Sequence, residues 1–273
     1  MELIVFDLDG TLLNSDSVIS PYTRETLLRL ERRGIAYTVA TGRTLHGSRE
    51  VMEGHGFGLP QIFKNGVMIW HPGREEFSHR NFLTLDEIEH VLQAILAQKI
   101  TPFIFTLESG NRHAIYHPPL QTDIERKLAG DFGSRYTVDV LPASELPADA
   151  EITNISALGE AVAIDAVDQL IAAELNLVAY AGAAIENRDM KWIDIHHSDA
   201  SKGGAVEVLR DMLGADKLVC FGDSENDLSM FASADECYAP ENAKASVKAV
   251  ATAIIGHHHE DGIARYLRER FEL

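Results

Sequence analysis

The chain alternates short apolar runs with longer segments in which apolar residues recur at helical spacing. The first run, residues 3–6, is continuous and rich in branched side chains, as in a strand buried on both faces of a parallel sheet. Ser20-Pro21 predicts a helix start, with Ser20 as the cap and Pro21 at the first helical position, and Gly34 predicts the helix end. A second apolar run over 35–40 then completes a βαβ unit.

The middle of the chain has a different pattern. Residues 61–70 predict a hairpin with Asn65-Gly66 as its turn, and Thr84-Leu85-Asp86-Glu87 is a capping box that opens a helix. The elements expected beyond it are strands at 101–107, 112–117, 136–140, 151–157, 176–181 and 184–188, with helices at 120–130 and 160–174. This mixed α+β pattern predicts an insertion rather than a continuation of the parallel sheet.

The opening pattern resumes at about residue 191, with a strand at 192–195, a helix at 201–213 and a buried strand at 218–221. The sequence therefore predicts an α/β fold in which a Rossmann-like, doubly wound parallel sheet is formed by 1–81 and 191–273. An inserted α+β domain is predicted at 82–190.

Composition and charge narrow the possible partners. The chain has 273 residues, of which 45% are hydrophobic, and no apolar run approaches the ~20 residues of a membrane span. A formal net charge of −18 disfavours nucleic acid and anionic membrane surfaces, which bind through Lys and Arg. The amino terminus lacks the basic segment and the cleavage site of a signal peptide. The two cysteines are expected to be packed, reduced thiols, which is typical of a cytoplasmic protein.

Two carboxylates directly follow the first strand. Asp7 and Asp9 lie one residue apart, and Gly10 allows the chain to turn after them. Ligands of open α/β sheets bind at the carboxyl ends of strands, where Asp7 is expected. Carboxylates crowded at such a place repel each other unless a cation joins them, and Mg²⁺ with its preference for oxygen ligands is the natural choice. An ordinary Asp-Gly turn is the alternative reading.

Three further motifs are expected at the same edge of the sheet. Each has an ordinary explanation when taken alone: Thr41 as a helix cap, Lys202 as a surface lysine, and Gly222-Asp223 as a turn. Their order and their placement at strand ends and helix starts favour one shared crevice that binds a metal ion and a phosphoryl group. The motifs are Thr41-Gly42, Ser201-Lys202-Gly203 and Gly222-Asp223-Ser224-Glu225-Asn226-Asp227.

With Asp7-x-Asp9-Gly10-Thr11, this motif set resembles that of the haloacid dehalogenase superfamily. The insertion between the second and third motifs is similar to that of the Cof-type sugar-phosphatase branch. Segments matching that branch are Ala40-Thr41-Gly42-Arg43, Asn65-Gly66, Pro240-Glu241-Asn242-Ala243 and Glu260-Asp261-Gly262-Ile263-Ala264. The resemblance covers nearly the whole chain. Ser224 departs from it, because many relatives carry Asn at this position.

The resemblance implies a Mg²⁺-dependent phosphatase that acts on a small phosphate monoester, such as a sugar phosphate, through an aspartyl-phosphate. Asp7 would be the nucleophile, and Asp9 would protonate the leaving alcohol and then activate water. The implied metal ligands are Asp7, Asp9 through its backbone carbonyl, and Asp223. The insertion would be a mobile cap that closes over the site.

The resemblance also assigns the phosphate contacts. Thr41, the Gly42 amide and Lys202 would hold phosphoryl oxygens, with Asn226 as a further contact. Asp227 would orient a metal-bound water or Lys202 from outside the metal's own ligand set.

Several alternatives stay open at this level. A phosphomutase would share every core motif and would transfer phosphate to a second hydroxyl. A non-enzymatic phospho-acceptor would have no use for an acid at Asp9 or for so large an insertion. Arg43 could face the substrate or pair with carboxylates of the insertion. Two groups of histidines have no assigned role, His196-His197 and His257-His258-His259, and the second resembles a metal-binding tract.

Overall fold

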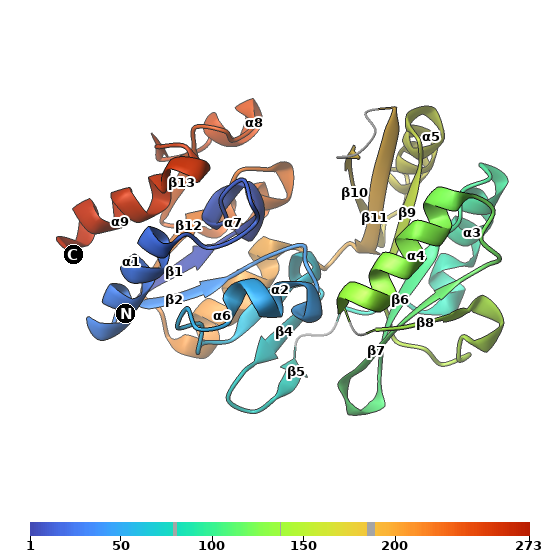
Figure 1. Ribbon diagram of the computed structural model, residues 1–273, viewed down its shortest axis with the longest axis horizontal. Coiled ribbons are helices and arrows are strands. Elements are labelled where there is room, and N and C mark those ends of the chain that lie inside the picture. The colour runs from blue at the N-terminus through green and yellow to red at the C-terminus, as the bar shows by residue number, and fades with distance from the viewer. Residues whose placement is uncertain (79–80, 137, 185–188) are drawn as a thin grey trace. The chain divides into compact units, whose positions relative to one another are not determined.

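The computed structural model describes residues 1–78, 81–136, 138–184 and 189–273 (Figure 1). The chain divides into two compact units. Unit 1 comprises Met1–Arg80 and Ala200–Leu273, and unit 2 comprises Asn81–Asp199. None of the helices in the described ranges is both long enough and apolar enough to cross a membrane.

Unit 1 is built on a five-stranded sheet in the order β14-β13-β12-β1-β2, in which every neighbouring pair is parallel. The apolar runs predicted at 3–6, 35–40 and 218–221 form β1, β2 and β12, whereas β13 and β14 were not predicted, and β1 lies between β12 and β2. The carboxyl ends of these three strands therefore lie side by side at one edge. The strands are β1 (Glu2–Phe6), β2 (Ala36–Val39), β12 (Lys217–Phe221), β13 (Glu236–Pro240) and β14 (Ala253–Ile255).

Helices cover both faces of this sheet, which explains the continuous apolar character of β1. Leu3 and Val5 pack on one face in a core shared with α6 and α7. On the other face, the ring of Phe6 lies 5.2 Å from that of Phe221, in an aromatic series that continues to Tyr266 of α9. The helices of unit 1 are α1 (Pro21–Arg32), α2 (Leu45–Met52), α6 (Lys202–Leu213), α7 (Leu228–Ser233), α8 (Ala245–Lys248) and α9 (Gly262–Phe271).

The two ends of the chain meet through α1 and α9 (Figure 1). Helix α1 begins as predicted, because Ser20 Oγ accepts the backbone N–H of Thr23 at 3.0 Å. The guanidinium of Arg268 in α9 lies 3.7 Å from the ring centroid of Tyr22. These contacts close the sheet's second face with helices from opposite ends of the sequence.

The predicted hairpin at 61–70 is present but has a longer turn than two residues. Strands β3 (Gln61–Phe63) and β4 (Met68–His71) are antiparallel, and β5 (Glu76–Ser78) adds a third strand. The turn is a short 3-10 segment, Lys64–Gly66, with Asn65 and Gly66 both at positive φ.

Unit 2 has a six-stranded sheet in the order β10-β11-β9-β6-β7-β8, in which only the β7–β8 pair of this described sheet is parallel. Helices α3 (Leu85–Ala97) and α5 (Ala161–Ile171) pack on one face and α4 (Asp123–Tyr136) on the other. The strands are β6 (Phe103–Glu108), β7 (Arg112–His117), β8 (Asp139–Pro142), β9 (Ile152–Glu160), β10 (Leu177–Ala183) and β11 (Met190–His197).

One predicted strand belongs to a different sheet from the one expected. The strand expected at 192–195 is present as β11, but it pairs antiparallel with β9 and β10 in unit 2 and not with the parallel sheet of unit 1. The predicted boundary at 190/191 therefore lies inside β11. The strand expected at 184–188 lies, beyond residue 184, outside the described residues. The sequence of a short strand predicts that the segment is extended, but it gives little information about which sheet the strand pairs with.

Candidate active site

A tight loop follows β1 and carries the two carboxylates that the sequence singled out. The backbone N–H of Asp7 donates to Phe221 O at 2.9 Å, so Asp7 lies beside the end of β12. Gly10 has φ +73°, and a Cβ on it would lie 2.5 Å from Asp223 Oδ2. A glycine is required here because the loop turns and passes against Asp223 with no room for a side chain.

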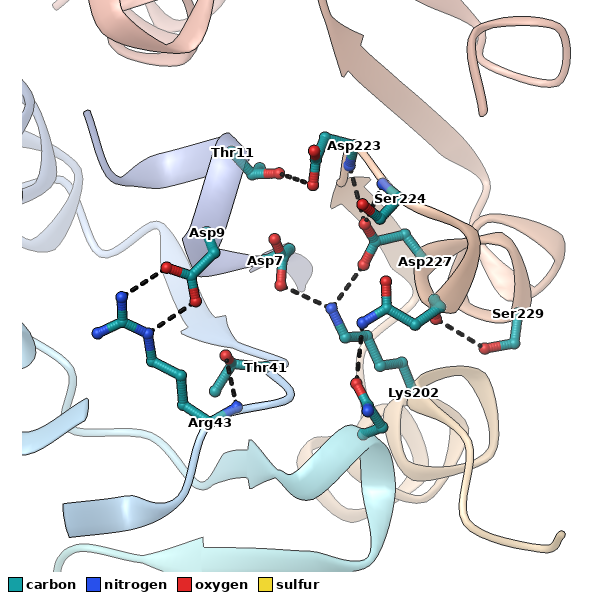
Figure 2. Close-up of polar contacts among 12 residues, drawn as sticks. Asp7, Asp9, Thr11, Thr41, Arg43, Lys202, Asp223, Ser224, Asp227 and Ser229 are labelled. Atoms are coloured by element: carbon teal, nitrogen blue, oxygen red, sulfur yellow. Dashed lines mark hydrogen bonds and ion pairs between the residues drawn. The ribbon is translucent and has the colours of Figure 1, made fainter. Parts of the chain in front are cut away.

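Lys202 lies at the centre of the acidic residues, as Figure 2 shows. Its Nζ is 2.6 Å from Asp7 Oδ1 and 2.6 Å from Asp227 Oδ1. The side chain is fully buried, and helix α6 begins at this residue with Ser201 Oγ capping the Gly204 N–H. Burial opposes the charged form, but Asp227 and Asp7 more than offset it, so the pKa of Lys202 is raised and the ammonium stays charged.

Asp227 fixes the backbone of the turn that presents Asp223. Its Oδ2 accepts the backbone N–H groups of Asp223 at 2.8 Å and Ser224 at 2.9 Å. Asp223 in turn receives a hydrogen bond from Thr11 Oγ1 at 3.4 Å (Figure 2). Asp227 thus binds Lys202 through one oxygen and shapes the Asp223 turn through the other.

The electrostatics of this cluster favour a divalent cation. Carboxylate oxygens of Asp7, Asp223 and Asp227 all lie within 4.8 Å of one another, and Lys202 supplies one positive charge against three negative ones. Burial, with the charge of Asp227 adding to it, raises the pKa of Asp223 to about 6. The pKa of Asp7 is also raised, chiefly by burial against the opposing effect of Lys202. Oxygen donors with this excess negative charge fit Mg²⁺.

Asp9 points to a different partner. Its two carboxylate oxygens accept from Arg43, at 2.7 Å from Nε and at 2.5 Å from a terminal nitrogen. Arg43 itself is held by a hydrogen bond from its other terminal nitrogen to Gly47 O. The arginine therefore pairs with the acid of the first motif.

The second motif continues the same edge of the sheet. Thr41 Oγ1 accepts the backbone N–H of Arg43 at 3.1 Å, while the Thr41 carbonyl accepts from Asn65 N at 3.0 Å. Asn65 Oδ1 accepts from Asn226 Nδ2 at 2.9 Å, and a Cβ on Gly42 would lie 3.2 Å from that same oxygen. The hairpin turn thus links the second motif to the fourth through a pair of amides.

Gly66 holds this turn against the start of α6. It has φ +102°, and a Cβ on it would lie 2.1 Å from Ser201 O. Gly66→Ala is expected to lower the free energy of unfolding by about 1–3 kcal/mol or more, because the alanine would be strained at this φ and its Cβ would clash with the Ser201 backbone. Chemical denaturation measures this change. Gly214→Ala is the matched control, since Gly214 has φ +61° but no atom within 4 Å of its Cβ position. Equal costs at the two glycines would contradict the clash.

Three features of the site were not predicted from the sequence. The Arg43 guanidinium contact to Asp9, the Asn65 amide and the Asn242 contact to Gly10 O at 2.7 Å all join residues far apart in the chain. Asn65 and Asn242 belong to segments that resemble the family, and this resemblance was the only feature of the sequence that could have indicated a role for them. Among the histidines to which the sequence assigned no role, His196 is buried in β11 of unit 2.

Comparisons with known proteins show what the chain is similar to. The family model for haloacid dehalogenase-like hydrolases matches residues 4–267. A 5-amino-6-(5-phospho-D-ribitylamino)uracil phosphatase of Bacillus subtilis, YitU, is 26% identical over 290 aligned positions, covering 99% of this chain and 98% of the relative. The HMP-PP phosphatase of Escherichia fergusonii is 27% identical, with 97% and 94% of the two chains covered.

The fold has close counterparts among solved structures. One, described as a haloacid dehalogenase subclass IIB sugar phosphatase, superposes with a TM-score of 0.76 over 100% of this chain and 99% of that one. Its sequence identity is 21%, so this likeness establishes the fold alone.

Proposed function

The chain belongs to the haloacid dehalogenase-like hydrolases and is a phosphatase of small phosphorylated substrates, and we propose that Asp7 is its nucleophile and Mg²⁺ its cofactor. One observation carries this proposal: a fully buried lysine bridges Asp7 and Asp227 beside Asp223, where β1 and β12 end. Such a cluster combines a fixed carboxylate with the positive charge that a phosphoryl group needs.

In this proposal Asp7 attacks phosphorus. One of its oxygens is held by Lys202, which fixes the carboxylate's orientation and leaves the other oxygen, Oδ2, to form the bond. As the Asp7–phosphorus bond forms, the bond from phosphorus to the ester oxygen breaks, and the alcohol leaves with a proton. Water then attacks the aspartyl-phosphate, releasing inorganic phosphate and restoring the carboxylate.

Asp7, Asp223 and the backbone carbonyl of Asp9 are the groups that would hold Mg²⁺. When bound, the ion screens the negative phosphate from the negative nucleophile. The raised pKa values of Asp7 and Asp223 support this assignment, because burial disfavours the negative charge of both carboxylates and a bound cation would stabilise it.

Asp9 is the proposed acid and base. Protonated, it gives its proton to the leaving oxygen, and as the resulting carboxylate it takes a proton from the attacking water. Both of its oxygens are bound to Arg43 in this structure. Arg43 must therefore release at least one of them during each cycle, so Arg43 is a positioning residue that sets where Asp9 rests between steps.

Phosphate binding falls to groups around the same edge. Lys202 can contact phosphoryl oxygens from its buried position, and the Thr41 hydroxyl and the Gly42 amide lie on the adjoining loop. Asn226 is proposed as a further donor, with its side chain held in place by Asn65 at 2.9 Å. Donors fixed before the substrate arrives stabilise the charge that develops in the transition state.

Unit 2 is proposed to be the inserted domain that selects the substrate. The relatives act, by their names, on a ribitylaminouracil phosphate and on HMP-PP, so the panel for this chain should span sugar phosphates and phosphorylated heterocycles. The relatives are named phosphatases, which favours hydrolysis over the phosphomutase alternative.

The first test is a panel of phosphate esters, assayed for phosphate release with Mg²⁺ and after exhaustive chelation. Hydrolysis of at least one small ester is expected with Mg²⁺. Chelation should reduce the rate at least about 10³-fold, because the carboxylate cluster then repels the phosphate without a counter-charge. Addition of Mg²⁺ should restore the rate. Full activity in the chelated enzyme would contradict the proposed metal dependence.

The affinity for Mg²⁺ is expected to fall as pH falls through about 6, the pKa of Asp223. Below that pH the carboxyl carries a proton, and the metal must displace it, so the apparent Kd should rise by up to about tenfold per pH unit. Isothermal titration at about pH 5 and about pH 7.5 measures the change. In Asp223→Asn the affinity should be low at both pH values and vary less between them. An unchanged Kd in the wild type would contradict this pKa assignment.

A further inference from the structure

Three consecutive histidines gather in the turn between β14 and α9, outside the acidic cluster. One ring nitrogen from each of His257, His258 and His259 lies within 4.8 Å of the other two. The ring centroids of His257 and His259 are 3.8 Å apart, and those of His257 and His258 are 4.9 Å apart. Successive side chains of an extended chain point in opposite directions, so this convergence comes from the 3-10 turn at His258–Glu260.

The turn has a closed backbone that presents these rings. The carbonyl of His257 accepts the N–H groups of Glu260 at 3.0 Å and Gly262 at 3.1 Å. Asp261 has φ +57°, and its carboxylate accepts from Thr23 Oγ1 at 2.9 Å. A Cβ on Gly262 would lie 1.8 Å from Gly256 O, so the two ends of the turn are in direct contact.

The hydrogen bonds of His258 leave one of its nitrogens available as a ligand. His258 Nδ1 lies 2.8 Å from Leu13 O, and a carbonyl can only accept, so Nδ1 carries the proton. The neutral ring then has its lone pair on Nε2. A histidine that binds a metal through one nitrogen commonly donates its other N–H to a backbone carbonyl in this way.

We propose that His257, His258 and His259 form a binding site for a borderline divalent transition-metal ion such as Zn²⁺, separate from the proposed Mg²⁺ cluster. Three imidazole nitrogens suit Zn²⁺ far better than Mg²⁺, which prefers oxygen. Glu260 Oε1, 4.0 Å from His259 Nε2, offers a fourth ligand. Zinc–nitrogen bonds of about 2.0–2.1 Å require nitrogens roughly 3.3 Å apart, so the rings, none of which is fully buried, must rotate closer together when the ion binds.

The site is connected to the loop that carries Asp9. The backbone N–H of His258 donates to Asn242 Oδ1 at 3.2 Å, and Asn242 Nδ2 donates to Gly10 O at 2.7 Å. With the His258 contact to Leu13 O, this places hydrogen bonds at both ends of segment 10–13. A metal that fixes His258 is therefore expected to stabilise the folded chain, by an amount that grows with metal concentration.

The test uses the full chain without a histidine tag, titrated with Zn²⁺ by calorimetry in excess Mg²⁺. One equivalent of Zn²⁺ should bind, and Co²⁺ in its place should give the intense visible absorption of a site with fewer than six ligands. His257→Gln and His259→Gln should each weaken binding at least about tenfold. His257 is partly exposed and His259 is exposed, so the fold should persist in both variants, and a melting curve without metal checks this.

Two controls separate this site from others on the protein. His90→Gln alters a partly exposed histidine of unit 2 that pairs with Glu174, and Asp223→Asn weakens the acidic cluster. Both variants should keep the Zn²⁺ equivalent. The proposal is overturned if His257→Gln and His259→Gln bind Zn²⁺ as the wild type does, if Asp223→Asn alone loses it, or if the wild type binds no Zn²⁺ in excess Mg²⁺.

Discussion

Asp7→Asn is expected to abolish hydrolysis, with a loss of at least about 10⁴-fold in kcat on every ester. An amide cannot displace the alcohol from phosphorus, and neither Asp223 nor Asp227 can replace Asp7, because Thr11 and Lys202 hold these carboxylates in other positions. Binding of the ester should survive, since the proposed phosphate contacts are other residues.

The control for this variant is Asp16→Asn, the same change at an exposed aspartate away from the cluster. It should leave kcat and KM unchanged. Because Asp7→Asn also removes one charge partner of the buried Lys202, its melting temperature must be measured with its rate. A folded Asp7→Asn enzyme with wild-type turnover would contradict the assignment of the nucleophile.

Asp9→Asn is expected to slow turnover of an alkyl phosphate by about 10²–10⁴-fold, the usual contribution of a general acid–base group. The loss in the first step should be smaller for p-nitrophenyl phosphate, whose leaving group needs little protonation. Mg²⁺ affinity should change little, because Asp9 is proposed to bind the ion through its backbone carbonyl.

Pre-steady-state kinetics on both esters separate the two half-reactions of this variant. Arg43→Gln is the companion variant, because it frees the Asp9 carboxylate from its bidentate contact and keeps the acid. Its rate loss on the alkyl ester should be smaller than that of Asp9→Asn. Equal losses on the two ester types in Asp9→Asn would rule out a role in protonating the leaving group.

Much of unit 1 could be predicted from the sequence, because its information is local. The run at residues 3–6 is apolar throughout since β1 is covered by helices on both faces, and Ser20 caps its helix through a contact three residues away. The convergence of the motifs at Asp7, Thr41 and Asp223 could also be predicted, because parallel strands place their carboxyl ends at one edge.

What could not be predicted depends on contacts between distant residues. Strand β11 has the alternating character of a strand, but nothing in its residues indicates that it joins β9 rather than the parallel sheet. Likewise, Arg43 could have reached several acids, and only the folded loop sets its guanidinium on Asp9. The convergence of His257 to His259 follows from the 3-10 turn at His258–Glu260 and from the close contact of Gly256 with Gly262, which no spacing rule predicts.

Passage of the phosphoryl group through Asp7 is tested most directly by acid quenching of a single turnover with ³²P-labelled ester. The experiment uses Asp9→Asn with the activated ester p-nitrophenyl phosphate. In this variant hydrolysis of the phospho-enzyme should be slowed more than its formation, so the phospho-enzyme should accumulate. Label should appear in the protein only with Mg²⁺, map to the peptide that contains Asp7, and be absent from Asp7→Asn. Label on a different residue, or equal labelling of Asp7→Asn, would contradict the mechanism.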